Sequence, residues 1–333
     1  MQLNIEMYRK LLCKYVAVFA IFIVSFLFYG CNEGPKVSDS VKKIKIDLQV
    51  ERFDAEFAAA TPENLPVLKK KYPYLFPARY ADSVWVAKMN DTLQIELLSE
   101  VEKTFSDFSE EEESLKFLFQ HITYYFPKFE VPKVVTVTSD VDYSNRVILT
   151  DTLLLVGLDN YLGPEHRFYG DIQKYVSADL YKQYLDVDVA SAFAKKVVAR
   201  PQERTFLAQL IYYGKELYLI DKLLPSGTDA QKLHYSEKQF DWSQANEQPM
   251  WRNFVENEYL YSTDKTLARR FLDPAPFSKF GLELDNESPG RIGRYLGWQI
   301  VRAFMDKNEV KLQQMLNLPA EEIFKKSNYK PKK

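Results

Sequence analysis

Residues able to do acid–base or metal chemistry are few in this chain and widely spaced. The three histidines, His121, His166 and His234, are separated by 45 and 68 residues. A zinc hydrolase of the H-E-x-x-H type needs two imidazoles four residues apart on one helical face, with a glutamate as base. That pattern is absent from the sequence. We expect His121, between Phe119 and Ile122, to be packed or solvent-facing, and not a metal ligand.

Other catalytic patterns are also missing from the sequence. It contains neither a G-x-S-x-G nucleophile turn nor a Gly-x4-Gly-Lys-Ser/Thr phosphate loop. Of the two cysteines, Cys13 lies in an apparent targeting segment and Cys31 is expected to be acylated, so neither is available as a nucleophile. We therefore predict a protein that is not an enzyme and that needs no cofactor and no metal.

Candidates for a binding groove come from two glycine-bearing stretches. The candidate residues are Tyr213, Gly214, Asp221, Asp285, Glu287 and Arg291. The Arg291 guanidinium could bind a carboxylate in a bidentate way, whereas Asp285 and Glu287 could instead cap a helix. Asp221 is either solvated at a helix end or, if buried, needs a hydrogen-bond partner or a cation. We expect any groove to open near residues 285–291.

The second of these stretches, Pro274–Phe304, predicts a loop followed by a helix. Ser288 is a suitable N-cap, and Pro289 suits the first helical position because its missing N–H costs nothing there. We therefore expect a helix over residues 288–304, with the acidic residues before it near the positive end of its dipole.

Glycine spacing predicts how this helix packs. Gly293 and Gly297 are four residues apart and share one helical face. A second helix is predicted over residues 206–224, where apolar residues recur every three or four positions around Gly214 and the pattern stops at Pro225. Missing side chains let backbones approach closely, so these two helices are expected to pack together.

A change of period marks a small sheet within an otherwise helical chain. Residues 133–138, 146–149 and 152–157 are β-branched or apolar runs separated by Asp, Asn and Ser. Repeated βαβ alternation is absent. The sequence thus predicts a predominantly helical α+β fold, with two or three strands within residues 131–158.

The N-terminal 30 residues are predicted to be an export signal. Three basic residues precede the uncharged run Tyr15–Tyr29, whose helical length of about 22 Å is shorter than the ~30 Å hydrocarbon core. Gly30-Cys31 resembles the end of a bacterial lipoprotein signal, in which the cysteine receives a diacylglycerol and becomes the first mature residue. Phe28 and Tyr29 stand where that signal usually has an aliphatic and a small residue. The alternative is an ordinary signal peptide or an uncleaved anchor.

Composition divides the remaining chain into a tether and one domain. Residues 31–45 hold few large apolar groups and predict a flexible tether, and residues 46–333 predict a single globular domain. The net charge of −2 for the whole chain leaves −4 after a signal with three basic and one acidic residue. No nucleic-acid partner is indicated. The residues after Cys31 fit anchoring in either membrane.

Several stretches resemble a known family. Leu210–Tyr218, Pro274–Phe280, Asp285–Arg291 and Gly297–Val301, with the lipoprotein-like start, closely resemble the gliding-motility lipoprotein family GldB of the Bacteroidetes, and the similarity spans nearly the whole chain. The resemblance implies a lipid-anchored cell-envelope protein facing the periplasm. It also implies protein partners in the gliding-motility machinery or in the secretion apparatus coupled to it.

A fainter likeness connects the chain to gluzincin-type metalloprotease domains. Where that family has Glu just before Gly on its later helix, Tyr213 precedes Gly214. The likeness implies a degenerate zincin-like scaffold, a pseudo-protease without its zinc site. Two alternatives stay open: a metal-dependent hydrolase on that scaffold, and an envelope protein that binds a peptide or small ligand. The second alternative predicts an open pocket around Gly214 and Gly293.

Overall fold

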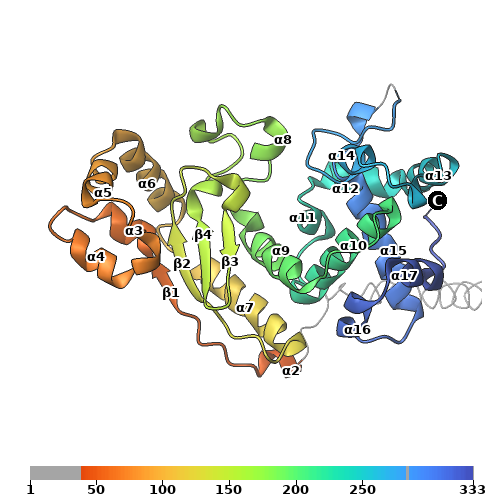
Figure 1. The fold of residues 1–333 in the computed structure, drawn as a ribbon, viewed down its shortest axis with the longest axis horizontal. Coiled ribbons are helices and arrows are strands. Elements are labelled where there is room, and N and C mark those ends of the chain that lie inside the picture. The colour runs from red at the N-terminus through yellow and green to blue at the C-terminus, as the bar shows by residue number, and fades with distance from the viewer. Residues whose placement is uncertain (1–38, 283–284, 333) are drawn as a thin grey trace, which may run out of the picture. The chain divides into compact units, whose positions relative to one another are not determined.

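The computed structural model describes residues 39–282 and 285–332. Residues from Asp39 onward form one compact unit, coloured from red to blue in Figure 1. The predicted signal, residues 1–30, and the predicted lipid-attachment residue Cys31 lie outside the described residues. None of the helices described in residues 39–282 and 285–332 has the length and apolar character needed to span a membrane.

A four-stranded mixed sheet lies in the N-terminal half of this unit (Figure 1). Its strands are β1 (Val50–Arg52), β2 (Lys133–Val137), β3 (Val147–Leu149) and β4 (Leu153–Gly157), in the order β1-β2-β4-β3. β2 runs parallel to β1 and β4, whereas β3 is antiparallel to β4. The predicted α+β class and the three predicted strands are confirmed. Sequence inspection missed β1 because its three residues contain Glu51 and Arg52 and form no apolar run.

Successive side chains of β2 point to opposite faces of the sheet, and both faces are buried. Val134 belongs to the main core, whereas its neighbour Val135 belongs to a smaller core with Phe57, Leu65 and Tyr72. Five helices lie between β1 and β2 in the chain. They are α3 (Phe53–Ala58), α4 (Leu65–Lys71), α5 (Asp82–Met89), α6 (Thr92–Thr104) and α7 (Ser109–Tyr125).

The start of the described chain already packs against the domain. Helix α2 (Asp39–Lys42) contacts α7, and its Val41 side chain is only 3% exposed. These residues lie within the segment 31–45 for which we expect a tether. His121 on α7 is buried, and its Nδ1 lies 2.9 Å from the carbonyl oxygen of Phe117, as expected for a packed histidine.

The C-terminal half of the domain is helical and contains most of the main core. After the single-turn α8 (Lys174–Ser177), its elements are α9 (Leu185–Val197), α10 (Phe206–Leu223), α11 (Asp229–Leu233), α12 (Glu237–Ala245), α13 (Glu247–Glu256), α14 (Thr266–Phe271), α15 (Ile292–Lys307), α16 (Leu312–Asn317) and α17 (Ala320–Ser327). The predicted 206–224 helix is confirmed as α10, and Thr205 caps it by accepting from the Ala208 N–H at 3.2 Å.

Glycines bring α10 and α15 into backbone contact. A Cβ atom added to Gly214 would overlap the carbonyl group of Gly297, and one added to Gly297 would overlap the carbonyl group of Leu210. A Cβ atom on Gly293 would lie 2.9 Å from Cδ2 of both Leu210 and Leu272. The predicted close packing of these two helices is therefore confirmed.

The start of α15 differs from the prediction. The helix begins at Ile292, and Ser288 does not cap it; its Oγ instead donates to the Asp285 carbonyl at 2.6 Å. The capping oxygen comes from across the loop, because Ser278 Oγ accepts from the Ile292 N–H at 3.2 Å and donates to the Pro289 carbonyl at 2.7 Å. The predicted Ser288–Pro289 start was therefore wrong, because a serine ten residues earlier satisfies the exposed N–H.

Candidate functional site

A cavity of about 330 Å³ opens beside the α10–α15 contact. Its lining residues come mainly from α8, α9, α10, α11, the start of α15 and the segment leading into β3, and Figure 1 labels these elements. Its charged or titratable lining consists of Arg146, Asp179, Asp188, Lys195, Glu216, Lys232, His234, Arg291 and Arg294, with Tyr143, Tyr175 and Tyr213 in addition. A concave site with convergent polar groups is the default candidate for a binding site.

Helical periodicity explains how the lining is assembled. Side chains three or four residues apart share a helical face. On α9 the lining positions are Asp188, Ser191 and Lys195; on α10 they are Tyr213, Glu216, Leu217 and Ile220; at the start of α15 they are Arg291 and Arg294. Because Gly214 and Gly297 fix how close α10 and α15 lie, the glycine contact also sets the distance between these two walls.

Asp188 is the most strongly held carboxylate in the cavity. It accepts from Arg146 Nε at 2.6 Å, from Arg146 Nη2 at 2.7 Å and from the Tyr161 hydroxyl at 2.9 Å. Burial alone would raise the pKa of Asp188, but the Arg146 charge and the hydrogen bonds from Arg146 and Tyr161 outweigh it and place that pKa below its usual value. Asp188 therefore stays ionised and fixes Arg146 in the wall.

His234 lies between two carboxylates and is itself buried. Its Nε2 is 3.4 Å from Asp188 Oδ1, its Nδ1 is 4.0 Å from Asp179 Oδ2, and its ring stacks on Tyr184 with centroids 4.4 Å apart. Burial lowers the pKa of His234 and outweighs the opposing effect of Asp188 and Asp179. The imidazole is therefore neutral at neutral pH, and its Nδ1 is buried without a hydrogen-bond partner.

Two cavity residues adopt left-handed backbone conformations. Arg291 has φ 62° just before α15, and His234 has φ 54° just after α11. Arg291 is held there by donating from Nη1 to Asp179 Oδ2 at 3.1 Å and from Nη2 to the His234 carbonyl at 3.3 Å. Residues outside the usual backbone regions persist only where surrounding contacts determine them, and they cluster at binding sites.

Arg294 and Glu216 differ from these paired groups because neither has a full set of partners. Arg294 Nε donates to the Leu272 carbonyl at 2.7 Å and its guanidinium lies 4.2 Å from the Tyr213 ring centroid, but no carboxylate of the described residues pairs with it. Burial and then the Arg291 charge lower the pKa of Arg294. Glu216 is 7% exposed, and its Oε1 is buried without a hydrogen-bond partner.

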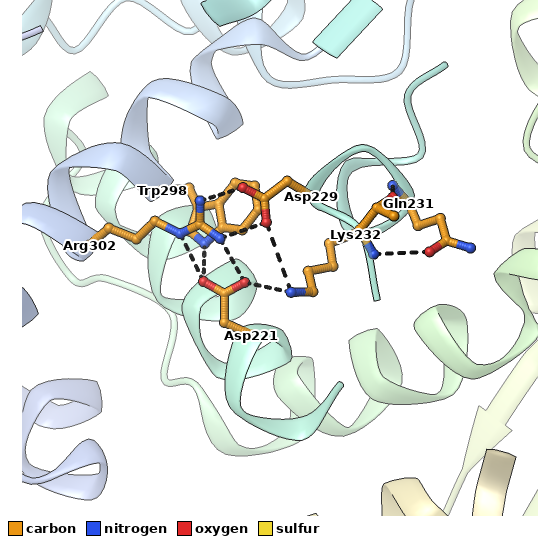
Figure 2. A network of polar contacts seen from close by, with 7 residues as sticks. Asp221, Asp229, Gln231, Lys232, Trp298 and Arg302 are labelled. Carbon is orange, nitrogen blue, oxygen red and sulfur yellow. Dashed lines mark hydrogen bonds and ion pairs between the residues drawn. The ribbon is translucent and has the colours of Figure 1, made fainter. Parts of the chain in front are cut away.

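Asp221, a predicted groove residue, belongs to a closed network next to the cavity (Figure 2). It accepts from Arg302 Nε and Nη2 at 2.9 Å each, from Trp298 Nε1 at 2.9 Å and from Lys232 Nζ at 3.0 Å. Arg302 also pairs with Asp229 at 2.6 Å. Solvation of Asp221 at the helix end is therefore wrong: its side chain is only 13% exposed and has cationic partners, as the alternative required.

The other predicted groove residues are divided between two places. Tyr213 and Arg291 line the cavity, and Gly214 lies in the filled helix contact next to it. Asp285 and Glu287 line a separate pocket of about 340 Å³ with Trp242 and Phe280. Asp285 Oδ2 also accepts from the Gly281 N–H at 2.8 Å. Neither caps α15, because the helix begins five residues after Glu287.

Sequence reasoning missed most of the cavity. Arg146, Asp188, His234 and Arg294 come from four distant segments, so no local motif joins them. A usable signal was the recurrence of polar residues on helix faces that are otherwise apolar, such as Asp188, Ser191 and Lys195 on α9. In residues 39–282 and 285–332, no group of three or more His, Cys, Asp or Glu side chains is arranged to hold a metal ion.

Comparison with known proteins assigns the chain to a family. Residues 34–331 match the family model described as gliding motility protein GldB. The chain belongs to the GldB family. This confirms the resemblance seen in the sequence and makes the chain a protein associated with gliding motility. The match covers every residue that lines the cavity. No curated protein and no solved structure matched the chain.

Proposed function

We propose that this chain is a lipid-anchored, periplasm-facing component of the gliding-motility machinery or of the secretion apparatus coupled to it, acting by binding other envelope components. The extent of the family match carries this proposal, because the match begins at residue 34, three residues after Cys31. The signal-like residues 1–30 and the cysteine thus precede the shared region. This order is expected of a chain whose leader is removed and whose first mature residue is acylated.

Contacts in the cavity support binding over catalysis. Covalent catalysis needs a nucleophile within hydrogen-bond reach of a base. Among the residues that the structure describes, neither ring nitrogen of His234 pairs with a Ser, Thr or Cys side chain; both face carboxylates. Asp188 is occupied by Arg146 and Tyr161. These fixed charges favour recognition of a ligand by a rigid wall.

The two cysteines provide a matched test of the anchor. In a gliding strain that lacks its own copy, the wild-type chain and Cys13→Ser should incorporate labelled palmitate, fractionate with membranes and restore gliding. Cys31→Ser should lose the label and restore little or no gliding, because it has no site for the lipid. A Cys31→Ser chain that is still labelled, or that restores gliding fully from the soluble fraction, would contradict the lipid anchor.

The alternative function, a metal-dependent hydrolase, makes a different prediction. It requires a stoichiometric metal in the purified chain and loss of gliding when a titratable side chain such as His166 is changed. Our proposal expects a folded chain without bound zinc or iron, and His166→Gln cells that glide normally. Metal analysis of the purified protein and a gliding assay of that variant decide between the two. Crosslinking in intact envelopes followed by affinity purification should then recover other envelope proteins.

A further inference from the structure

Arg294 is a partly satisfied cation inside the charged cavity. Its Nε donates to the Leu272 carbonyl, and its guanidinium carbon lies 4.2 Å from the Tyr213 ring centroid. These contacts hold the group in the cavity wall but leave its two Nη atoms without a hydrogen bond to the described protein. A guanidinium offers five N–H donors in a fixed fork. The Nη atoms of Arg294 are therefore available to bind an acceptor that the described chain does not supply.

Glu216 gives a second, independent sign of a missing partner. It lines the same cavity from α10, is 7% exposed and has an Oε1 atom buried without a hydrogen bond. Burial raises the pKa of Glu216, and the Tyr212 hydroxyl only partly opposes this. A carboxyl group that keeps its proton can donate one hydrogen bond. Arg294 and Glu216 thus leave hydrogen-bonding atoms on two helices without a partner.

The charge balance of the lining favours an anion. Five cationic side chains and three carboxylates line the cavity, and one of the cations, Lys232, is already paired with Asp221 outside it. Asp188 and Asp179 are matched by Arg146 and Arg291, so Arg294 and Lys195 leave the lining with a positive excess that suits an anion. The volume of about 330 Å³ is at the small end for ligand sites.

We propose that the cavity binds a carboxylate group, held by the fork of Arg294 with Glu216 and Lys195 as further contacts. A planar carboxylate fits the two parallel N–H donors of a guanidinium. Lys195 is exposed at the rim and forms no ion pair with the described residues, so it can attract the anion. The proposal rests on the binding role proposed above and assigns its chemistry: the carboxylate is either the end of a peptide chain or a small free acid.

Calorimetric titration of the purified full-length chain in detergent tests this assignment. The probes are N-acetyl-alanyl-alanine, its C-terminal amide, propionate and inorganic phosphate, each up to about 10 mM, where a millimolar Kd is still detected. We expect the free peptide acid to bind at least about tenfold more tightly than its amide. Propionate binding as tightly as the peptide acid identifies a small free acid; clearly weaker propionate binding identifies a chain terminus.

Matched arginine variants locate the site. Arg294→Gln should weaken binding of the peptide acid at least about tenfold, and Arg294→Lys should weaken it less, because it keeps the charge but loses the fork. Arg269→Gln, at an exposed arginine on α14 outside the cavity, should bind like the wild type. If Arg294→Gln does not fold, Lys195→Gln at the rim takes its place, with an expected loss of about two- to threefold.

Three results would overturn the carboxylate assignment: no binding of either acid, phosphate binding at least as tight as the peptide acid, or an Arg294→Gln chain that folds and binds like the wild type. This outcome is separable from that of the proposed function. An anchored chain that restores gliding but binds no probe removes the carboxylate site alone. A chain that binds the peptide acid while Cys31→Ser still glides removes the anchor alone.

Discussion

Two groups of charges on the same pair of helices differ in how completely they are paired. In the network of Figure 2, Asp221 of α10 meets Arg302 and Trp298 of α15 and Lys232, and every one of these groups has a partner. In the cavity, Glu216 of α10 and Arg294 of α15 both have unused hydrogen-bonding atoms. The two groups are separated by only five positions on α10 and eight on α15.

This difference indicates two roles for buried charge. A buried polar group without a hydrogen-bond partner costs about 1–3 kcal/mol, so it persists where something else compensates it. The Asp221 network is complete within the chain and contributes to holding α10, α11 and α15 together. Arg294 and Glu216 lack such partners within the described chain, and the ligand proposed above would supply them. The following three changes test that distinction, from the largest expected effect to the smallest.

Gly297→Ala should disrupt the contact between α10 and α15, on which both groups of charges depend. The added Cβ would overlap the Leu210 carbonyl group. Because this group belongs to the backbone of α10, it cannot rotate out of the way as a flexible side chain could. We expect a loss of about 3 kcal/mol or more in unfolding free energy, measured by urea denaturation. Gly227→Ala is the control: its Cβ would meet its nearest atom at 3.5 Å, an ordinary contact. Equal stability of the two variants would contradict the tight contact.

Arg302→Gln and Arg294→Gln should separate the paired from the unpaired cluster. Removing Arg302 leaves Asp221 and Asp229 without their bidentate partner, so we expect a loss of about 2 kcal/mol, reduced from the value for fully buried pairs because Arg302 is 26% exposed. Removing Arg294 breaks no ion pair and should cost about 1 kcal/mol or less. Urea denaturation of both variants measures the difference. Similar losses in the two would show that Arg294 has an unrecognised structural role.

Lys215 tests a third arrangement on α10, a buried cation whose partners are carbonyl groups. Its Nζ donates to Leu316 and Leu318 at 3.0 and 2.6 Å, and burial lowers the pKa of Lys215 to about 8. Between pH 8 and 10.5 the unfolded chain therefore binds more protons at this site than the folded chain, so stability rises with pH. From pH 8 to 9 the wild type should gain about 1 kcal/mol relative to Lys215→Met.

The matching measurement is urea denaturation of both chains across that pH range. The comparison with Lys215→Met removes the contribution of other titrating groups. A pH-independent difference between the two chains would mean that the carbonyl contacts keep Lys215 protonated in the fold throughout this range.

Local patterns in the sequence predicted the elements well. The three- and four-residue recurrence around Gly214 gave α10 to within one residue, and the two glycines of α15 gave the contact between the helices. These features depend on neighbours in the chain. The predicted start of α15 was wrong because the capping oxygen comes from Ser278, which is ten residues before Ser288 and across the loop from it.

The candidate site could be predicted only in part. Tyr213 and Arg291 were placed in a groove, and both line the cavity. Whether Asp221 is solvated or paired depends on Arg302, which is 81 residues away. The sequence alone therefore left both interpretations open. Arg146 and His234 reach the cavity through the sheet and α11, and their role depends on a fold that brings distant segments together. Pairing of charges is a tertiary property and has no local signature.

Backbone contact between α10 and α15 has a consequence for the thermodynamics of ligand binding. No layer of side chains lies between the helices at Gly214 and Gly297, so there are no rotamers through which the two could shift gradually. The separation between Glu216 and Arg294 is thus set before any ligand arrives. A preorganised pair loses little conformational entropy on binding, so a single carboxylate contact can retain more of its free energy as affinity.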